Sequence, residues 1–296
     1  MQSKLLKIIG LLFILGLYSC EKVIPFSGEV VQPKIVVNSF FNSSKNWKVF
    51  LTKSLSVTDT GKLDYIDNAS VLIKDEQNNI VDVLQHDSLG IYSGSSIPQL
   101  GERYKIEVEA LEYNSVYAED YLPNEVAISN VDTLTSYLNN EKILDLDIAI
   151  NDPIFEENYY YLKVNVGINT VDGFYETKRL QILVNNPLYE NSGPDKWDNK
   201  AIFTDFLFNG DNKIIKTAIK LPIVVNDVAY NLSDLDYLEI RLNNLTKSKY
   251  LYKKSYDLYE NASGNPFAQP IQVYSNITNG IGIFAGAQLN VFSVLQ

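Results

Sequence analysis

From residue 34 onward, apolar and polar residues alternate in short runs, which is the pattern of β-strands with one buried face. The clearest run is Arg103–Leu111, where apolar residues alternate with charged ones. Asparagines in Gln77–Asn79 tolerate the positive φ of a tight turn, so we expect a hairpin there. The pattern predicts seven strands with no helix between them: Lys34–Phe41, Trp47–Ser54, Ala69–Asp75, Ile80–Gln85, Gly90–Ser95, Arg103–Leu111 and Ser115–Leu122. Residues 34–123 are therefore predicted to form an immunoglobulin-like or prealbumin-like β-sandwich domain.

The pattern after residue 123 predicts a second β-rich domain, 124–296. One segment, Lys247–Asn261, has apolar residues at helical spacing and is followed by Gly264, which favours a helix end. The tail Ile271–Leu295 is predicted to be strand, with an interruption at Asn279-Gly280. The other predicted strands are Asn130–Leu138, Ile143–Asn151, Tyr159–Asn169, Thr177–Asn186, Ala201–Phe208, Lys213–Leu221 and Leu235–Asn243. The expected fold class is all-β, mainly antiparallel, with one C-terminal helix.

The first twenty residues have the layout of a secretory signal. Lys4 and Lys7 precede the apolar run Ile8–Leu17, which is too short to cross about 30 Å of hydrocarbon. Cys20 follows Leu17-Tyr18-Ser19, an ending similar to the lipobox of bacterial lipoproteins, and it is the only cysteine in the chain. We therefore predict a signal peptide at 1–19, lipidation of Cys20 and a membrane tether at 20–33.

Charge and histidine content narrow the functions that the chain can have. The formal net charge is −11, and it becomes −13 once Lys4 and Lys7 leave with the signal. Such a field disfavours nucleic acid and anionic lipid as partners, and the sequence shows no basic patch. His86 is the only histidine, which excludes a multi-histidine zinc site. It lies in a polar turn, where an exposed loop histidine is the favoured interpretation. No cofactor and no metal are predicted.

Two aromatic segments are candidates for an interaction surface. In the strand that begins at Tyr159, the side chains of Tyr159 and Tyr161 share one face. They either stack on a ligand ring or, as is more common, cover a sandwich core. Trp197 lies in a polar loop and is a candidate interface anchor. The spacing of Asp195 and Asp198 beside it matches no known calcium loop.

A further candidate follows the predicted helix. Pro266 and Pro270 fix φ and lack donors, so the segment that starts at Asn265 and ends at Pro270 is expected to be a rigid extended link. Gly280 and Gly282 are expected to permit a close backbone approach or a bulge in a terminal hairpin. A structural closure of the second domain is favoured over a binding loop. The aromatic residues that such a loop would offer are Phe267 and Tyr274.

Several segments together resemble a known family. They are Ser19–Lys22, Asp152-Pro153 with Asn158–Tyr160, Phe203–Gly210 and, as the most specific part, Asn265–Gly286. These segments are similar to the Bacteroidota lipoprotein family called domain of unknown function forty-two forty-nine, over nearly the whole mature chain. The resemblance implies a lipid-anchored, β-rich envelope protein from a family often encoded beside TonB-dependent outer-membrane receptors. No catalytic residues are established for the family, so the resemblance implies none.

These observations predict a non-enzymatic accessory lipoprotein of the outer membrane that binds a TonB-dependent transporter or another envelope complex. Two alternatives stay open, a glycan hydrolase that uses Asp and Glu and an adhesion module. For a hydrolase, Glu156 and Glu157 are adjacent, and adjacent strand residues point to opposite faces. Surface-export signals of such lineages place several acids after the cysteine, whereas here Lys22 follows Glu21. The sequence therefore favours neither the periplasmic nor the cell-surface side.

Overall fold

The computed structural model describes residues 32–56, 61, 63–154, 156–170, 173, 175–190, 196–263, 265 and 267–295. The predicted signal peptide at 1–19, the lipidation site Cys20 and most of the tether 20–33 lie outside the described residues. The chain groups into two units, one of Lys34–Ser54 with Lys62–Gln296 and one of Met1–Pro33 with Leu55–Gly61. All strands and the helix described below belong to the first unit.

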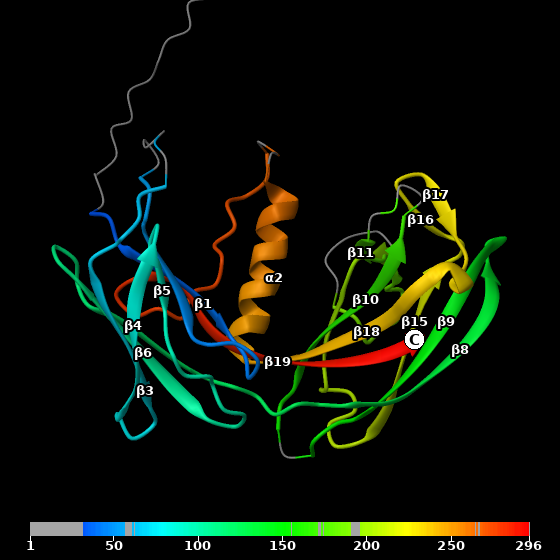
Figure 1. Cartoon of the computed structure of the whole chain (residues 1–296), viewed down its shortest axis with the longest axis horizontal. Coiled ribbons are helices and arrows are strands. Elements are labelled where there is room, and N and C mark those ends of the chain that lie inside the picture. The colour runs from blue at the N-terminus through cyan, green and yellow to red at the C-terminus, as the bar shows by residue number, and fades with distance from the viewer. Residues whose placement is uncertain are drawn as a thin grey trace, which may run out of the picture. The chain divides into compact units, whose positions relative to one another are not determined.

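Strands dominate this unit and most neighbouring strands run antiparallel (Figure 1), so the predicted all-β class with one helix is confirmed. The helix, α2, spans Lys247–Ala262, one residue longer than predicted. The first strands are β1 Ile35–Phe41, β2 Lys48–Lys53, β3 Ala69–Asp75, β4 Ile80–Ser88, β5 Ile91–Ser93, β6 Arg103–Ala110 and β7 Val116–Tyr121. They are followed by β8 Ile128–Leu138, β9 Glu141–Asn151, β10 Tyr159–Asn169, β11 Tyr175–Arg179, β12 Ile182–Leu183, β13 Trp197–Asp198, β14 Ala201–Thr204, β15 Asn212–Lys220, β16 Ile223–Val225, β17 Val228–Tyr230, the short 3₁₀ helix η1 Leu232–Asp234, β18 Leu235–Leu245 and β19 Ile281–Leu295.

The strands form two large sheets and one small hairpin. The larger sheet has the order β11-β10-β18-β19-β1-β2-β5-β4-β3-β6-β7, and β14 also pairs with β10. The second sheet has the order β13-β12-β15-β9-β8, and β16 pairs with β17. Two long strands change partners along their length. β4 pairs first with β3 and then with β5, and β19 pairs first with β1 and then with β18.

The first core is enclosed by β1 to β7 together with the start of β19. Alternate apolar side chains from several of these strands are fully buried in it, among them Val49, Leu51, Val71, Ile106 and Val108. The arrangement is consistent with the predicted sandwich. The predicted hairpin between β3 and β4 is confirmed, with Asn78 at φ 64°.

The second core joins the five-stranded sheet to β10 and β18. Leu146 and Ile148 of β9, Val164 of β10 and Ile240 of β18 are all fully buried there. The domain boundary predicted after residue 123 lies in the segment between β7 and β8. The division into two domains stays a prediction.

β19 is a single 15-residue strand whose first half runs parallel to β1. A Cβ built on Gly282, which has φ +114°, would lie 2.0 Å from the carbonyl oxygen of Val37, and one on Gly286 would lie 2.1 Å from that of Tyr121. A Cβ on Gly280 would lie 2.8 Å from the backbone oxygen of Ile35. The predicted close backbone approach is therefore confirmed. The predicted terminal hairpin was wrong, because the chain from Ile281 onward is one continuous strand.

Two predicted strands are shorter than expected because the chain leaves its sheet. The segment Thr177–Asn186 is divided, since the chain passes from β11 in the large sheet to β12 in the five-stranded sheet. The strand predicted to reach Phe208 ends at Thr204, because the Phe208 N–H turns back to donate to the Asp205 carbonyl at 2.7 Å.

Residues 271–279 do not form the predicted strand, apart from an isolated bridge between Thr278 and Tyr117. The side chain of Asn276 takes the place of a backbone ladder: its Oδ1 accepts the Phe284 N–H at 3.0 Å and its Nδ2 donates to the Phe284 carbonyl at 2.8 Å. The sequence pattern also missed the β16–β17 hairpin, whose turn residues Asn226 and Asp227 both have positive φ.

Candidate functional site

One face of the large sheet lies beneath α2 (Figure 1). Along β10, Leu162 and Val164 point into the second core, so Tyr159, Tyr161 and Lys163 project from the opposite face. Both tyrosines are buried in a small apolar cluster with Tyr250 of α2, and the rings of Tyr159 and Tyr250 lie 4.8 Å apart. The structure therefore brings two of the predicted interaction residues together, as supports for the helix.

The first turn of α2 is fastened by Thr246, which is fully buried. Its hydroxyl oxygen accepts the Lys249 N–H at 3.3 Å, as expected of an N-cap, and its O–H donates to Asp120 Oδ2 of β7 at 2.6 Å. The same Asp120 oxygen accepts the Gly286 N–H at 3.4 Å. One carboxyl group thus connects β7, β19 and the helix that covers the face.

Asp120→Asn is expected to change how stability depends on pH. Burial raises the pKa of Asp120 from 3.8 to about 6, against opposing hydrogen bonds from Thr246 and two backbone N–H groups. A carboxyl whose pKa is higher in the folded state contributes its stability below about pH 4 and loses it as the pH rises toward 6. Between pH 4 and pH 7 the free energy of unfolding of the wild type should therefore fall by about 2 kcal/mol relative to Asp120→Asn.

Urea unfolding of both proteins at pH 4 and pH 7 measures this difference. Glu119→Gln, an exposed neighbour on the same strand, is the matched control and should follow the wild type. An Asp120→Asn variant with the same pH dependence as the wild type would show that this carboxyl is already ionised at pH 4.

Three lysines gather on the face. The ammonium nitrogens of Lys163 on β10 and Lys253 on α2 lie 4.5 and 4.6 Å from the centre of the Tyr161 ring. One turn earlier on α2, the Lys249 nitrogen lies 4.8 Å from the centre of the Phe40 ring. Each contact lies within the range of a cation–π interaction. We call Lys163, Lys249 and Lys253 the lysine cluster.

The charges of the cluster oppose one another. Burial, followed by the nearby charges of Arg179 and Lys253, lowers the pKa of Lys163 to about 8. Burial, followed by the charges of Lys253 and Lys163, lowers the pKa of Lys249 also to about 8. The pKa of Lys253 is lowered as well, mainly by burial. Near pH 7 most of these groups are protonated, so positive charge is concentrated on the face. The repulsion between these charges lowers the free energy of unfolding.

Several acidic groups around the face already have cationic partners. Three ion pairs border it, with N···O distances of 2.6, 3.1 and 2.8 Å: Lys200–Asp257, Arg241–Glu239 and Lys254–Glu190. Within the described parts of the chain, none of the three clustered lysines forms an ion pair with a carboxylate.

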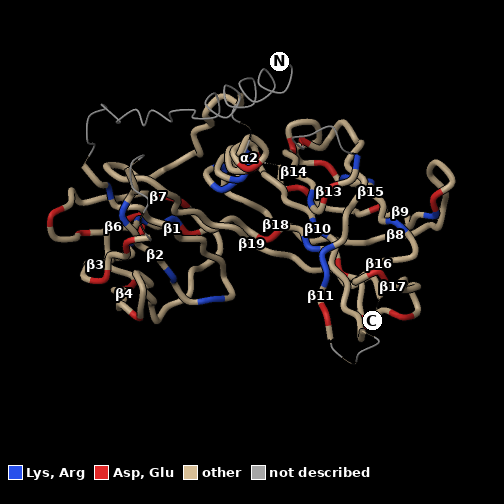
Figure 2. Tube along the Cα trace, turned by 90° about the horizontal axis from the view of Figure 1, so that it is seen from above, with Lys and Arg blue, Asp and Glu red and all other residues tan. Residues whose placement is uncertain are grey.

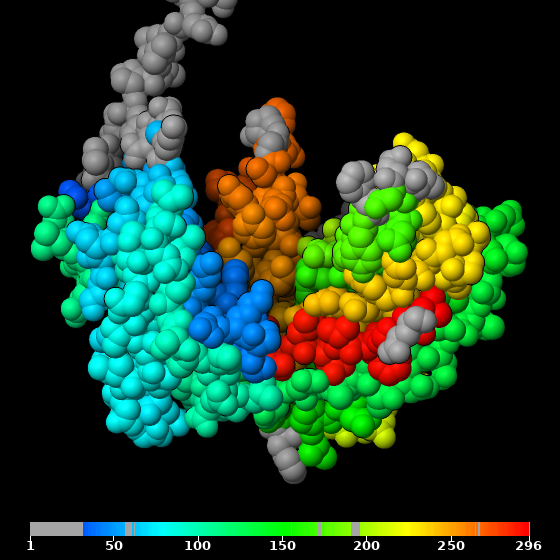
Figure 3. Space-filling model, in the orientation of Figure 1, coloured from blue at the N-terminus to red at the C-terminus, as the bar shows by residue number. Residues whose placement is uncertain are grey.

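The cluster is a local exception to the acidic surface. In Figure 2, segments bearing Lys and Arg lie on α2, β10 and β11, and Figure 3 shows the surface hollowed between α2 and the green strands. The expectation from sequence that no basic patch exists was wrong here. The lysines come from a strand and a helix that are distant in the chain, so the sequence does not show them together. One member could have been found, because Lys163 lies two residues after Tyr161 and therefore on the same face of the strand.

The other predicted interaction residues lie elsewhere. Trp197 belongs to β13 of the five-stranded sheet, is half-buried, and has the Lys220 nitrogen 5.1 Å from its ring centre. Phe267 is 94% exposed. Tyr274 is held against α2, because its N–H donates to the Ser255 hydroxyl at 2.8 Å. The structure does not place these three aromatic residues in the lysine cluster.

The segment from Asn265 to Pro270 turns, so the predicted rigid extended link was wrong. The Ala268 N–H donates to the Asn265 carbonyl at 3.0 Å, and the Asn265 side chain accepts the Phe267 N–H at 3.0 Å. A short polar side chain that bonds the backbone two residues later favours such a turn. Pro266 lies outside the described residues, and Pro270 is exposed.

The carboxylate pair weighed from sequence is not on a strand. Glu156 and Glu157 precede β10 and line the same pocket of about 410 Å³, with Arg103, Lys247 and Tyr159 on its other walls. The argument that adjacent residues point to opposite faces therefore does not hold here. Glu157 accepts a hydrogen bond from the Tyr159 hydroxyl at 3.0 Å.

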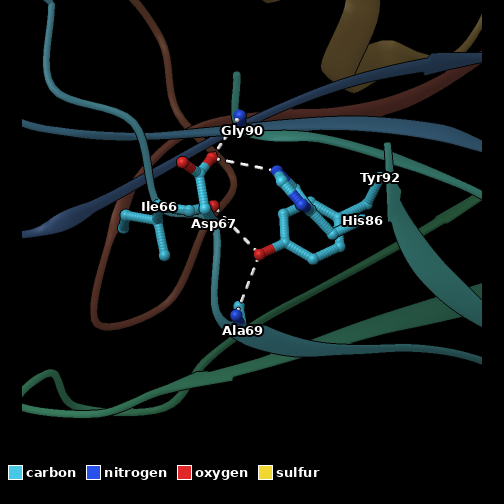
Figure 4. A network of polar contacts seen from close by, with 6 residues as sticks. All are labelled: Ile66, Asp67, Ala69, His86, Gly90 and Tyr92. Carbon is cyan, nitrogen blue, oxygen red and sulfur yellow. Dashed lines mark hydrogen bonds and ion pairs between the residues drawn. The ribbon is translucent and has the colours of Figure 1, made fainter. Parts of the chain in front are cut away.

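His86 lies on β4 and not in the predicted loop, because β4 continues to Ser88. Its Nε2 lies 3.0 Å from Asp67 Oδ1, an oxygen that also accepts the Gly90 N–H at 2.7 Å, and Figure 4 draws both contacts. The neighbouring Tyr92 hydroxyl donates to the Ile66 carbonyl at 2.9 Å. This network fixes the segment before β3. Among the described residues, no group of three His, Cys, Asp or Glu side chains is arranged to hold a metal ion.

A family model described as "Domain of unknown function (DUF4249)" matches residues 21–290. The chain belongs to the DUF4249 family. This confirms the family predicted from the sequence. A search of the curated proteins finds no match.

Two of the DUF4249 motif segments, Asp152-Pro153 with Asn158–Tyr160 and Phe203–Gly210, meet in a buried polar network next to the second core. Asp205, from Phe203–Gly210, accepts hydrogen bonds from the backbone N–H of Asn158 at 2.7 Å and from its side chain at 3.3 Å. The Asn244 side chain donates to Asn158 Oδ1 at 2.9 Å. Asp152 accepts from the Tyr160 hydroxyl and from the Gly210 N–H. These motif residues join the start of β10 to the turn after β14, so their role is structural.

Two solved structures resemble the DUF4249 chain weakly. One is described as "Complete structure of manganese lipoxygenase of Gaeumannomyces graminis and partial structure of zonadhesin of Komagataella pastoris", with 12% identity over 75% of this chain and 89% of that one and a TM-score of 0.16. The other is the Enterococcus faecalis MSCRAMM ACE, with 6% identity over 90% and 95% of the two chains and a TM-score of 0.18. At these TM-scores neither similarity supports a conclusion about fold or function.

Proposed function

We propose that this DUF4249 protein is an outer-membrane lipoprotein, anchored through Cys20, that acts as a non-enzymatic binding protein. Its partner in this proposal is a TonB-dependent transporter or another envelope complex, and its binding face is the lysine cluster of β10 and α2. The observation that carries the binding role is the lysine cluster, because a fold keeps unneutralised like charges together only at a cost. The side of the membrane is left open.

The anchor is supported by the sequence before β1. A basic start, a ten-residue apolar run and a lipobox-like ending are the pattern of a signal that is cleaved before Cys20, and they support this anchor. Among the described residues, no helix is long and apolar enough to cross a membrane. Two or more acyl chains anchor a protein stably, at about 0.8 kcal/mol per buried CH₂ group.

Cys20→Ser is expected to release the protein from membranes. Without the thiol no lipid can be attached, so the variant should lose the fatty acids and move from the membrane pellet to the soluble or unprocessed fraction. Fractionation with mass spectrometry of the mature amino terminus measures this. A wild-type chain that begins elsewhere, or that carries an unmodified Cys20, would end the anchoring proposal.

The binding role is tested by purification from detergent-solubilised membranes. A transporter or other envelope protein should co-purify with the wild type in fixed proportion, and substitution of the lysine cluster should weaken that association. A wild-type chain that always elutes alone as a monomer contradicts the accessory role. Cleavage of an envelope glycan that disappears in Glu156→Gln or Glu157→Gln would instead support the hydrolase alternative.

A further inference from the structure

The lysine cluster brings three positive charges close together without a carboxylate ion-pair partner among the described residues. Lys163 and Lys253 approach the same Tyr161 ring from a strand and from the helix, so their nitrogens are at most about 9 Å apart. Lys249 and Lys253 are four residues apart on α2 and therefore share one side of the helix, where like charges destabilise it. The helix is held in this position by its buried cap at Thr246.

Within the described parts of the chain, no carboxylate lies at ion-pair distance from these three ammonium groups, although Asp120, Asp257 and Glu260 lie near enough to influence them. Lys200, Arg241 and Lys254 have carboxylate partners at 2.6 to 3.1 Å, whereas the lysine cluster has aromatic rings. Arg179 adds a further positive charge next to Lys163. The three ammonium groups therefore share positive charge without a carboxylate ion-pair partner among the described residues.

We propose that the lysine cluster binds a small oxyanion with two or more negative charges, carried by carboxylate or phosphate groups. Ammonium groups bind such oxygens through short charge-assisted hydrogen bonds. The rings of Tyr161 and Phe40 provide an apolar base beside them. This inference rests on the proposed binding role and names the chemistry of its ligand.

The charge of the whole protein restricts the ligand to a compact one. A formal charge of −11 repels extended polyanions, such as nucleic acid or an anionic membrane surface, over distances near the Debye length of about 8 Å. A small anion at the lysine cluster interacts mainly with the local lysines. We therefore expect binding of di- and tricarboxylates or phosphate, and no binding of oligonucleotides or anionic vesicles.

The pH dependence follows from the same groups. Binding needs protonated lysines, so affinity should fall as the pH rises from 7 through 8 to 9. The other charged groups that influence the cluster are Arg179, Arg241, Lys200, Asp120, Asp257 and Glu260. Of the neighbouring acids, Asp120 is bound to Thr246 and Asp257 to Lys200.

Calorimetric titration of the purified soluble chain with citrate, inorganic phosphate and, as a neutral probe, glucose tests the proposal. At least one of the two anions should bind saturably and glucose should not, and the preferred anion distinguishes a carboxylate from a phosphate ligand. Lys163→Gln/Lys253→Gln should weaken binding by about a hundredfold, tenfold for each lost charge-assisted contact. The control Lys34→Gln/Lys216→Gln makes the same change of charge at exposed positions and should bind as the wild type does.

Thermal unfolding separates binding from folding. Without ligand, Lys163→Gln/Lys253→Gln should have a melting temperature equal to or a few degrees above that of the wild type, because repulsion is removed. With citrate or phosphate only the wild type and the control should gain stability.

Equal losses of affinity in both double variants, tighter binding of oligonucleotide or anionic vesicles than of small anions, or no saturable binding would overturn the proposal. Co-purification of an envelope partner without anion binding would reject the oxyanion alone and leave the proposed function standing.

Discussion

Gly282→Ala is expected to destabilise the fold by about 4 kcal/mol, or to prevent folding. Gly282 has φ +114°, a conformation that strains any residue with a Cβ by about 1 to 3 kcal/mol. The added carbon would also lie 2.0 Å from the Val37 carbonyl oxygen, which belongs to the neighbouring strand and cannot move without breaking the β1–β19 ladder. Overpacking of this kind costs about 1 to 3 kcal/mol more.

The midpoint of urea unfolding, compared with that of the wild type, measures this effect. Gly61→Ala is the control, since a Cβ there meets no atom within 4 Å, and it should change the free energy of unfolding by less than about 0.5 kcal/mol. If both variants unfold at the same urea concentration as the wild type, the close parallel approach of β1 and β19 does not exist in solution.

Asp205→Ala is expected to destabilise the protein by about 3 kcal/mol. Asp205 is 3% exposed, and its carboxylate accepts two hydrogen bonds from Asn158, which is 2% exposed. Removal of the carboxylate leaves the Asn158 N–H without its acceptor inside the fold, and such a buried donor costs about 1 to 3 kcal/mol in addition to the lost charge-assisted bond.

Chemical denaturation measures this loss, and Asp211→Ala provides the control. Asp211 is an exposed aspartate in the same turn, so its replacement should leave stability within about 0.5 kcal/mol. Asp205→Asn keeps one acceptor oxygen and should fall between the two. A loss from Asp205→Ala no larger than that from Asp211→Ala would show that the network does not hold the start of β10.

The alternation of apolar and polar residues predicted most of the fold, because a strand that is buried on one face has an apolar residue at every second position. β3 and β10 were predicted to the residue, and α2 to within one residue. The errors arose where side chains or sheet changes decide the backbone. The division between β11 and β12 and the pairing of Asn276 with Phe284 depend on partners that are distant in the sequence.

The candidate site was predicted only in part. Tyr159 and Tyr161 were identified because they repeat every second residue, the period of a strand. Lys249 and Lys253 lie on a helix among many charged residues, so nothing in their local sequence distinguishes them from ordinary solvated lysines. Their importance comes from the strand they face, and that contact is set by the cap at Thr246 and its bond to Asp120.

The position of β19 also determines the order in which the chain can fold. β1 has β2 on one side and residues 281–286 on the other, so the loop from Val36 to Ile281 must close before β1 is fully paired. Contacts so distant in sequence slow folding. While the chain is being made, one edge of β1 and one edge of β18 stay open to any extended segment, which is the condition for mispairing and aggregation. Folding of this protein is therefore expected to finish only after residue 295 is available, and a chain that stops before residue 281 should aggregate.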